Sequence, residues 1–210
     1  MSLWSIVVKG GLIIIPIILC GVLTLAIIIE RLISLKNSEI DSEKFVEEIE
    51  QILRRRKIKE ALDFCEKYDK PVPRIIKEGL LKSDRTREEI REAIEDAANH
   101  EIPNLEKFLG ILATIATVAP LLGLLGTVTG LIKAFMVIEA KGGLVNPGDL
   151  ARGIWEALIT TVAGLMVAIP AYLAYNYFVS RVNNLILQME KSATRILDII
   201  FLLKSEEEEI

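Results

Sequence analysis

Three long runs without a charged residue constrain this chain more than any other feature. They cover residues 10–29, 108–132 and 157–180, and hold 20, 25 and 24 residues. A helix needs about 20 apolar residues to cross ~30 Å of hydrocarbon. Because 51% of the chain is hydrophobic and 26% is charged, the charges must gather between these runs. The pattern predicts an all-α membrane protein with three transmembrane helices.

The stretches between the runs predict how the chain is divided. Lys, Arg, Glu and Asp dominate residues 31–107, where apolar residues recur at helical spacing, so this part is predicted to be a helical domain in water. The first run exceeds the 7–15 residues of a signal-peptide core, and an uncleaved first span is expected. The predicted segments are a lead (1–9), the first span (10–30), the helical domain (31–107), the second span (108–137), a loop (138–153), the third span (154–180) and a final helix and tail (181–210).

Two local signals predict helix starts in the charged region. Ser42 is expected to cap its first helix, and Thr86 with Glu89 forms the pattern of a capping box. Only Pro103 separates the helix after that box from the second span. The sequence therefore predicts one long helix from about Arg87 through the membrane, bent near Pro103.

Positive charges indicate the orientation of the spans. Of 25 Lys and Arg residues, 17 lie in residues 31–107 and 4 after residue 180. The residues that flank the spans carry the stronger signal, and Arg31, Lys107 and Arg181 all fall on one side. The amino terminus is therefore expected outside and the carboxyl terminus in the cytoplasm.

Small and hydroxyl-bearing residues form a stripe on each of the second and third spans when ~100° is counted per residue. The second-span stripe holds Ala116, Ala119, Pro120, Gly123, Gly126, Thr127, Gly130 and Ala134. The third-span stripe holds Gly153, Ala157, Thr160, Thr161, Gly164, Ala168 and Ala171, with Glu156 at its border. Such stripes occur where helices pack closely, and they also occur where helices line a hydrated or partner-filled lumen. Both interpretations stay open on this pattern.

The chemistry that is missing also limits the function. None of the three uncharged runs contains the acid or base that a proton relay needs, so another chain must supply it if protons are conducted. Glu156 begins the third span and, on the simplest interpretation, pairs with Arg152 one turn earlier. The sequence contains no nucleotide-binding loop, nucleophile–base pair, metal-ligand spacing or concentrated basic patch. An enzyme, a cofactor and a nucleic-acid partner are not expected.

Two segments resemble the signature spans of the ExbB/TolQ/MotA proton-channel family. They are residues 117–130, TVAPLLGLLGTVTG, and residues 155–176, WEALITTVAGLMVAIPAYLAYN. The three-span layout with an outside amino terminus is similar to ExbB and TolQ rather than to four-span MotA. The resemblance implies a multi-pass protein of the bacterial inner membrane. It does not separate the ExbB type from the TolQ type.

The resemblance implies a pentamer whose second and third spans surround two helices of an ExbD- or TolR-like one-span partner. That partner's aspartate would carry protons, and the complex would transmit force to a TonB- or TolA-like protein. Motif by motif, the implied proton-pathway residues are Thr127, Thr161 and Glu156, with Thr160 as a second hydroxyl that leaves open which of the pair faces the partner. This favours a lumen role for Thr127 and Thr161. The alternatives are a structural scaffold with helix-packing stripes and, less favoured, a self-sufficient transporter.

Overall fold

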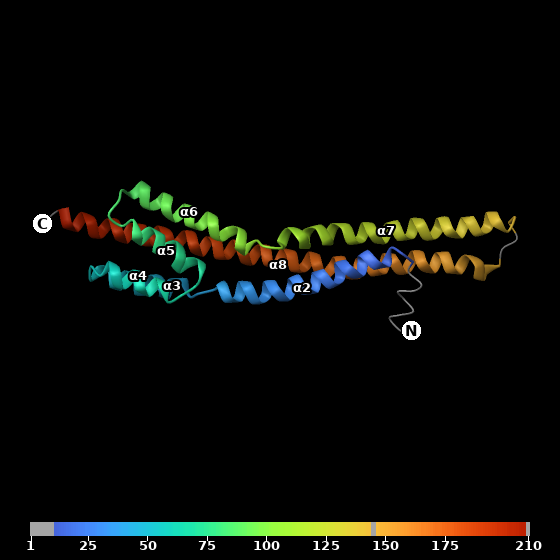
Figure 1. The fold of residues 1–210 in the computed structure, drawn as a ribbon, viewed down its shortest axis with the longest axis horizontal. Coiled ribbons are helices and arrows are strands. Elements are labelled where there is room, and N and C mark those ends of the chain that lie inside the picture. The colour runs from blue at the N-terminus through green and yellow to red at the C-terminus, as the bar shows by residue number, and fades with distance from the viewer. Residues whose placement is uncertain (1–10, 144–145, 209–210) are drawn as a thin grey trace. The chain divides into compact units, whose positions relative to one another are not determined.

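The computed structural model describes residues 11–143 and 146–208, and the regular elements among them are all helices. The predicted lead of residues 1–9 lies outside the described residues. The helices are α2 (Ile14–Ser38), α3 (Ser42–Arg54), α4 (Ile58–Glu66), α5 (Pro71–Leu81), α6 (Arg87–Leu105), α7 (Leu109–Ala140) and α8 (Pro147–Glu208) (Figure 1). Within the described residues, three helical stretches are long and apolar enough to cross a membrane. The predicted all-α membrane fold is confirmed.

The chain forms two compact units. The membrane unit contains the described residues up to Arg31 together with Phe108–Phe178, and the charged unit contains Leu32–Lys107 and the described residues from Val179 onward. Helices α2 and α8 each contribute residues to both units. Helix α8 begins at Pro147 rather than at the predicted residue 154. Proline is favoured in the first helical turn because its missing N–H would have no partner there.

The membrane unit is held together by a core to which α2, α7 and α8 all contribute. Its buried residues are Ile27, Leu112, Ile115, Ala119, Ala168 and Ala171. Helix α2 approaches α8 closely, since a Cβ placed on Gly21 would lie 3.2 Å from the Val167 side chain. Large apolar side chains such as Leu121, Met166 and Leu173 point outward from this core. Exposed apolar faces of this kind are stable in hydrocarbon.

The prediction of one continuous helix from Arg87 through the second span is wrong, because the helix is interrupted between Leu105 and Leu109. Phe108 adopts a left-handed backbone conformation, with φ of 65°. Its ring packs against the membrane-unit core and lies beneath the buried Arg31 guanidinium, 5.6 Å from the ring centroid. These contacts offset the ~1–3 kcal/mol that such a conformation costs a bulky residue. Pro103 lies inside α6 and does not mark the break.

The helix starts in the charged unit correct one prediction and confirm another. Asp41, not Ser42, caps α3, because its carboxylate accepts the Lys44 N–H at 3.2 Å. The Ser42 hydroxyl lies 2.9 Å from the side-chain oxygen of Gln188 on α8. The capping box of Thr86 and Glu89 is present, with both of its reciprocal bonds. An aspartate satisfies the free amides of the first turn as well as a serine does, so sequence alone did not separate these neighbours.

Candidate functional site

The small-residue stripes of α7 and α8 meet each other within the membrane unit. The two helices run side by side in Figure 1. A Cβ placed on Gly130 would lie 2.7 Å from the Gly153 carbonyl oxygen, and one on Gly123 would lie 3.0 Å from the Thr161 Cα. Backbone therefore touches backbone, which only the absence of side chains allows. We call this contact the α7–α8 seam; its residues are Ala119, Gly123, Gly126, Gly130, Ala134, Gly153, Ala157, Thr160, Thr161 and Gly164.

The predicted stripe residues divide by depth. Gly123, Gly126 and Gly130 on α7 are buried, as are Ala157, Gly164 and Ala168 on α8. Ala116 and Pro120 are half-buried; Ala116 packs against the membrane-unit core. For the buried positions, packing between two helices of one chain is sufficient to explain the small side chains.

Thr160 lies in the seam. Its side chain is fully buried and fills the space left by Gly126, where a Cβ would overlap the Thr160 hydroxyl. That hydroxyl lies 3.0 Å from the Glu156 carbonyl oxygen and 2.9 Å from the Ala157 carbonyl oxygen, both in its own helix. A hydroxyl satisfied in this way supports a packing role for Thr160 within one chain.

Thr161 and Thr127 lie at the edge of the seam and keep part of their surface exposed. The Thr161 hydroxyl is 3.1 Å from the Gly123 carbonyl oxygen on α7 and 3.4 Å from the Ala157 carbonyl oxygen. The Thr127 hydroxyl donates to the Leu124 carbonyl oxygen at 2.6 Å. Each hydroxyl thus has a backbone partner, and each residue keeps part of its surface exposed. Of the adjacent pair, Thr161 is the one that another molecule could approach.

Glu156 forms its ion pair across the helices. In the described part of the chain its carboxylate pairs with Lys133 of α7, and no pair with the predicted partner Arg152 is present. The Glu156 side chain is 14% exposed and that of Lys133 is 55% exposed. Arg152 is exposed. The sequence-based prediction missed this pair because it considered only partners within α8. A signal for the pair was present, since Lys133 directly follows one uncharged run and Glu156 directly precedes the next.

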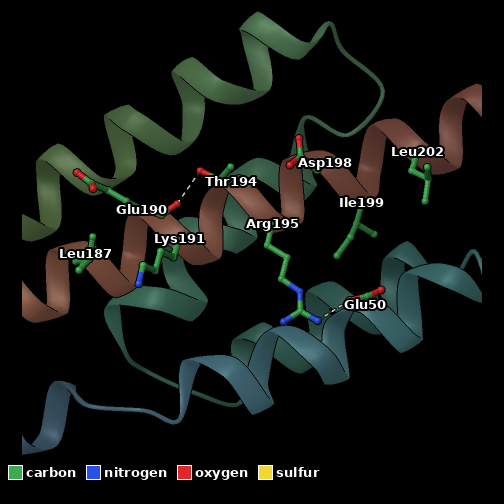
Figure 2. Close-up of a pocket in the computed structure, with 9 residues that line it drawn as sticks. All are labelled: Glu50, Leu187, Glu190, Lys191, Thr194, Arg195, Asp198, Ile199 and Leu202. Atoms are coloured by element: carbon green, nitrogen blue, oxygen red, sulfur yellow. Dashed lines mark hydrogen bonds and ion pairs between the residues drawn. The ribbon is translucent and has the colours of Figure 1, made fainter.

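A groove outside the membrane unit lies in the charged unit. It has a volume of about 740 Å³, and α8 supplies all of its lining residues except Glu50 of α3 (Figure 2). Figure 2 shows Arg195 reaching from α8 to the Glu50 carboxylate, with which it pairs at 2.9 Å. Among the described residues, no cluster of His, Cys, Asp and Glu is suited to hold a metal ion. The groove is an open, mixed-charge surface without the converging groups of a catalytic site.

The Glu50 pairing predicts how acid affects the charged unit. Hydrogen bonds from Arg54 and then Arg195 lower the pKa of the Glu50 carboxyl below its ordinary value. The stability from these bonds is therefore fully present above the ordinary carboxyl pKa and is lost as the pH falls through the lowered pKa. We expect Glu50→Gln to lower the unfolding temperature at neutral pH. On acidification, the unfolding temperature of this variant is expected to fall less than that of the parent chain.

The measurement is the unfolding temperature of the detergent-solubilised chain between neutral and acidic pH. Glu47→Gln is the matched control, because Glu47 is exposed on the same helix. Equal pH profiles for the parent chain and Glu50→Gln would contradict the expectation.

The sequence of this chain is similar to a known protein family and to several of its members. The family described as the MotA/TolQ/ExbB proton channel family matches residues 67–191. An ExbB-like biopolymer transport protein of Synechocystis is 34% identical over 170 residues, or 80% of this chain and 81% of the relative. An ExbB homologue of Methanothermobacter thermautotrophicus is 34% identical over 183 residues, or 87% of this chain and 64% of the relative. The Tol-Pal system protein TolQ of Haemophilus influenzae is 49% identical over 88 residues, or 41% of this chain and 38% of TolQ.

Proposed function

We propose, because the chain belongs to the MotA/TolQ/ExbB proton channel family, that it is the channel-forming subunit of a complex that converts a proton gradient into mechanical work. The three apolar helices of the described residues, together with the family, support a multi-pass protein of the inner membrane. Its positively charged flanks favour a periplasmic amino terminus and a cytoplasmic carboxyl terminus. The work would be passed to the outer membrane through a TonB- or TolA-like protein.

One observation supports the proposal: Thr127 and Thr161 lie at a partly exposed edge of the seam, within the two helical stretches that contain no acid. Residues 108–132 and 157–180 hold no charged side chain. A proton path along this edge therefore needs a titratable group from another chain. An ExbD- or TolR-like one-span protein with an aspartate in its span would supply that group. Five copies of this chain would surround two such helices.

The free energy released by one proton crossing the membrane limits how strongly this chain and its one-span partner can bind each other. One charge crossing 100 mV releases about 2.3 kcal/mol, so each step can overcome only a few kcal/mol of contact energy. The Thr127 and Thr161 hydroxyls already bond backbone carbonyl oxygens at 2.6 Å and 3.1 Å. They therefore offer a partner weak, replaceable contacts instead of a strong ion pair. Such a surface suits a helix that must move past it.

A structural scaffold is the second candidate, and the close α7–α8 seam is the observation that favours it. Close packing of α7 against α8 explains the buried glycines without a lumen. A scaffold packed in this way needs no proton gradient. The two candidates differ in one measurable respect, which is whether activity depends on the gradient.

The test uses this chain co-expressed with a one-span, aspartate-bearing membrane protein from the same source. Native mass spectrometry of the purified complex is expected to give five copies of this chain with two of the partner. A protonophore is expected to stop the activity of the complex in cells. A chain that binds no such partner, or activity unchanged by the protonophore, would contradict the proposal and favour the scaffold.

A further inference from the structure

We propose that Glu156 works as an anchor for the ends of the three membrane helices, held by Lys133 beneath the backbone of Gly11, and not as a proton carrier beside the threonines. The inference rests on the proposed function, since it concerns which residues of that channel face the moving partner. Lys133 and Gly11 are then positioning residues. Glu156 would act through the shape of the hairpin that carries Thr127 and Thr161.

The direction of the side chains on α8 is the first argument. Thr161 lies five positions after Glu156, so the two side chains point about 140° apart around the helix. Thr161 faces the Gly123 carbonyl oxygen of α7. Val167, which lies only about 20° from Glu156 around α8, contacts Gly21 of α2. Glu156 thus shares the face of α8 that turns toward α2, whereas Thr161 lies at the opposite edge of the seam.

The surroundings of the carboxylate are the second argument. Gly11 has a φ of 65°, and a Cβ built there would overlap the Glu156 carboxylate and lie 3.5 Å from Lys133 Nζ. The backbone before α2 therefore lies directly over the ion pair. Three separate segments of the chain meet at one carboxylate, whose side chain is only 14% exposed. A group enclosed by its own chain in this way is poorly placed to exchange protons with a second protein.

The energetics of such a pair give the inference a sharp test. Removing Lys133 leaves the mostly buried Glu156 carboxylate, whose side chain is 14% exposed, without its counter-charge, whereas removing or exchanging both charges does not. If Glu156 is an anchor, activity depends on whether the charges at positions 133 and 156 are balanced. If Glu156 is a proton carrier, activity depends on a carboxylate at position 156. The two roles predict opposite results for variants that change both positions together.

The experiment measures gradient-driven activity and assembly of the complete complex with its one-span partner. Lys133→Met is expected to reduce activity by about 10-fold or more, and Lys133→Arg is expected to retain it. Glu156→Gln is also expected to reduce activity, because it removes the carboxylate that lies between Lys133 and Gly11. The neutral pair K133M/E156Q and the exchanged pair K133E/E156K are the decisive variants. At least one of them is expected to recover activity to within about 3-fold of the parent chain. Arg152→Met is the matched control and is expected to be unchanged.

The inference is overturned if both paired variants stay as inactive as Glu156→Gln while Arg152→Met behaves like the parent. If the single variants fail to assemble, the assembled fraction becomes the readout, and failure of both paired variants to restore it overturns the inference as well. If the activity of the parent complex does not depend on the proton gradient, the proposed function is contradicted instead. The coupling of positions 133 and 156 would still be measurable then, as the unfolding temperatures of the single and paired variants.

Discussion

Replacing Thr127 and Thr161 together by valine is expected to abolish gradient-driven activity while the complex still assembles. Valine has nearly the volume of threonine, so the edge of the seam keeps its shape. The lost hydroxyls bond backbone carbonyl oxygens of Leu124 and Gly123, and a hydrogen bond of this kind contributes only about 0.5–1.5 kcal/mol. What the variant removes is the pair of hydroxyls that a moving, aspartate-bearing helix would meet.

The measurement combines gradient-driven activity in cells with the size of the purified complex. Thr114→Val with Thr117→Val is the matched control, because both side chains are exposed on α7 away from the seam. Their hydroxyls donate to carbonyl oxygens of their own helix at 2.8 Å and 2.7 Å, so the control removes the same kind of bond. Full activity of T127V/T161V would refute the proposed role of the two threonines and leave the scaffold as the better account.

The second large effect is expected at Gly130, where Gly130→Ala should destabilise the α7–α8 seam by about 1–3 kcal/mol. The added Cβ would lie 2.7 Å from the Gly153 carbonyl oxygen and 2.9 Å from the Ala157 Cβ. The Gly153 contact is with backbone, which cannot turn aside as a flexible side chain can. The helices must therefore separate, and the contacts along the whole seam weaken together.

The unfolding temperature of the purified chain checks this expectation. Gly110→Ala is the matched control, since a Cβ at Gly110 meets nothing within 4 Å. Alanine has the higher helix propensity, so the control is expected to be unchanged or slightly more stable. Equal unfolding temperatures for G130A and G110A would mean that the seam tolerates separation and does not fix the positions of Thr127 and Thr161.

The sequence was sufficient to predict the three spans and the faces on which their small residues lie. Both follow from regular patterns, namely the absence of charge over a membrane thickness and the turn of ~100° per residue. The break at Phe108 was not predictable in this way. Neither glycine nor proline stands at that position, and the left-handed conformation depends on tertiary contacts with Arg31 and the membrane-unit core.

The candidate site shows the same division between local pattern and tertiary contact. Thr160 and Thr161 are neighbours, and a helical projection places both near the stripe. Their difference in depth arises from the position of Gly126 on the other helix, which leaves room for Thr160. The ion pair of Lys133 with Glu156 likewise depends on how α7 and α8 are aligned. The burial of Thr160 and the pairing of Lys133 with Glu156 are determined by contacts between helices, and the sequence of one helix does not predict them.

The break at Phe108 also determines which helices can act as levers. Two membrane helices, α2 and α8, continue into the charged unit as single helices, whereas α7 is separated from α6 by three non-helical residues. A continuous helix passes a tilt or rotation along its axis, and a left-handed residue acts as a joint that absorbs it. A partner that pushes on the α7 edge of the seam would therefore move α7 about the joint at Phe108. Helix α8 has no such joint, because its 62 residues form one helix that passes from the membrane unit into the charged unit.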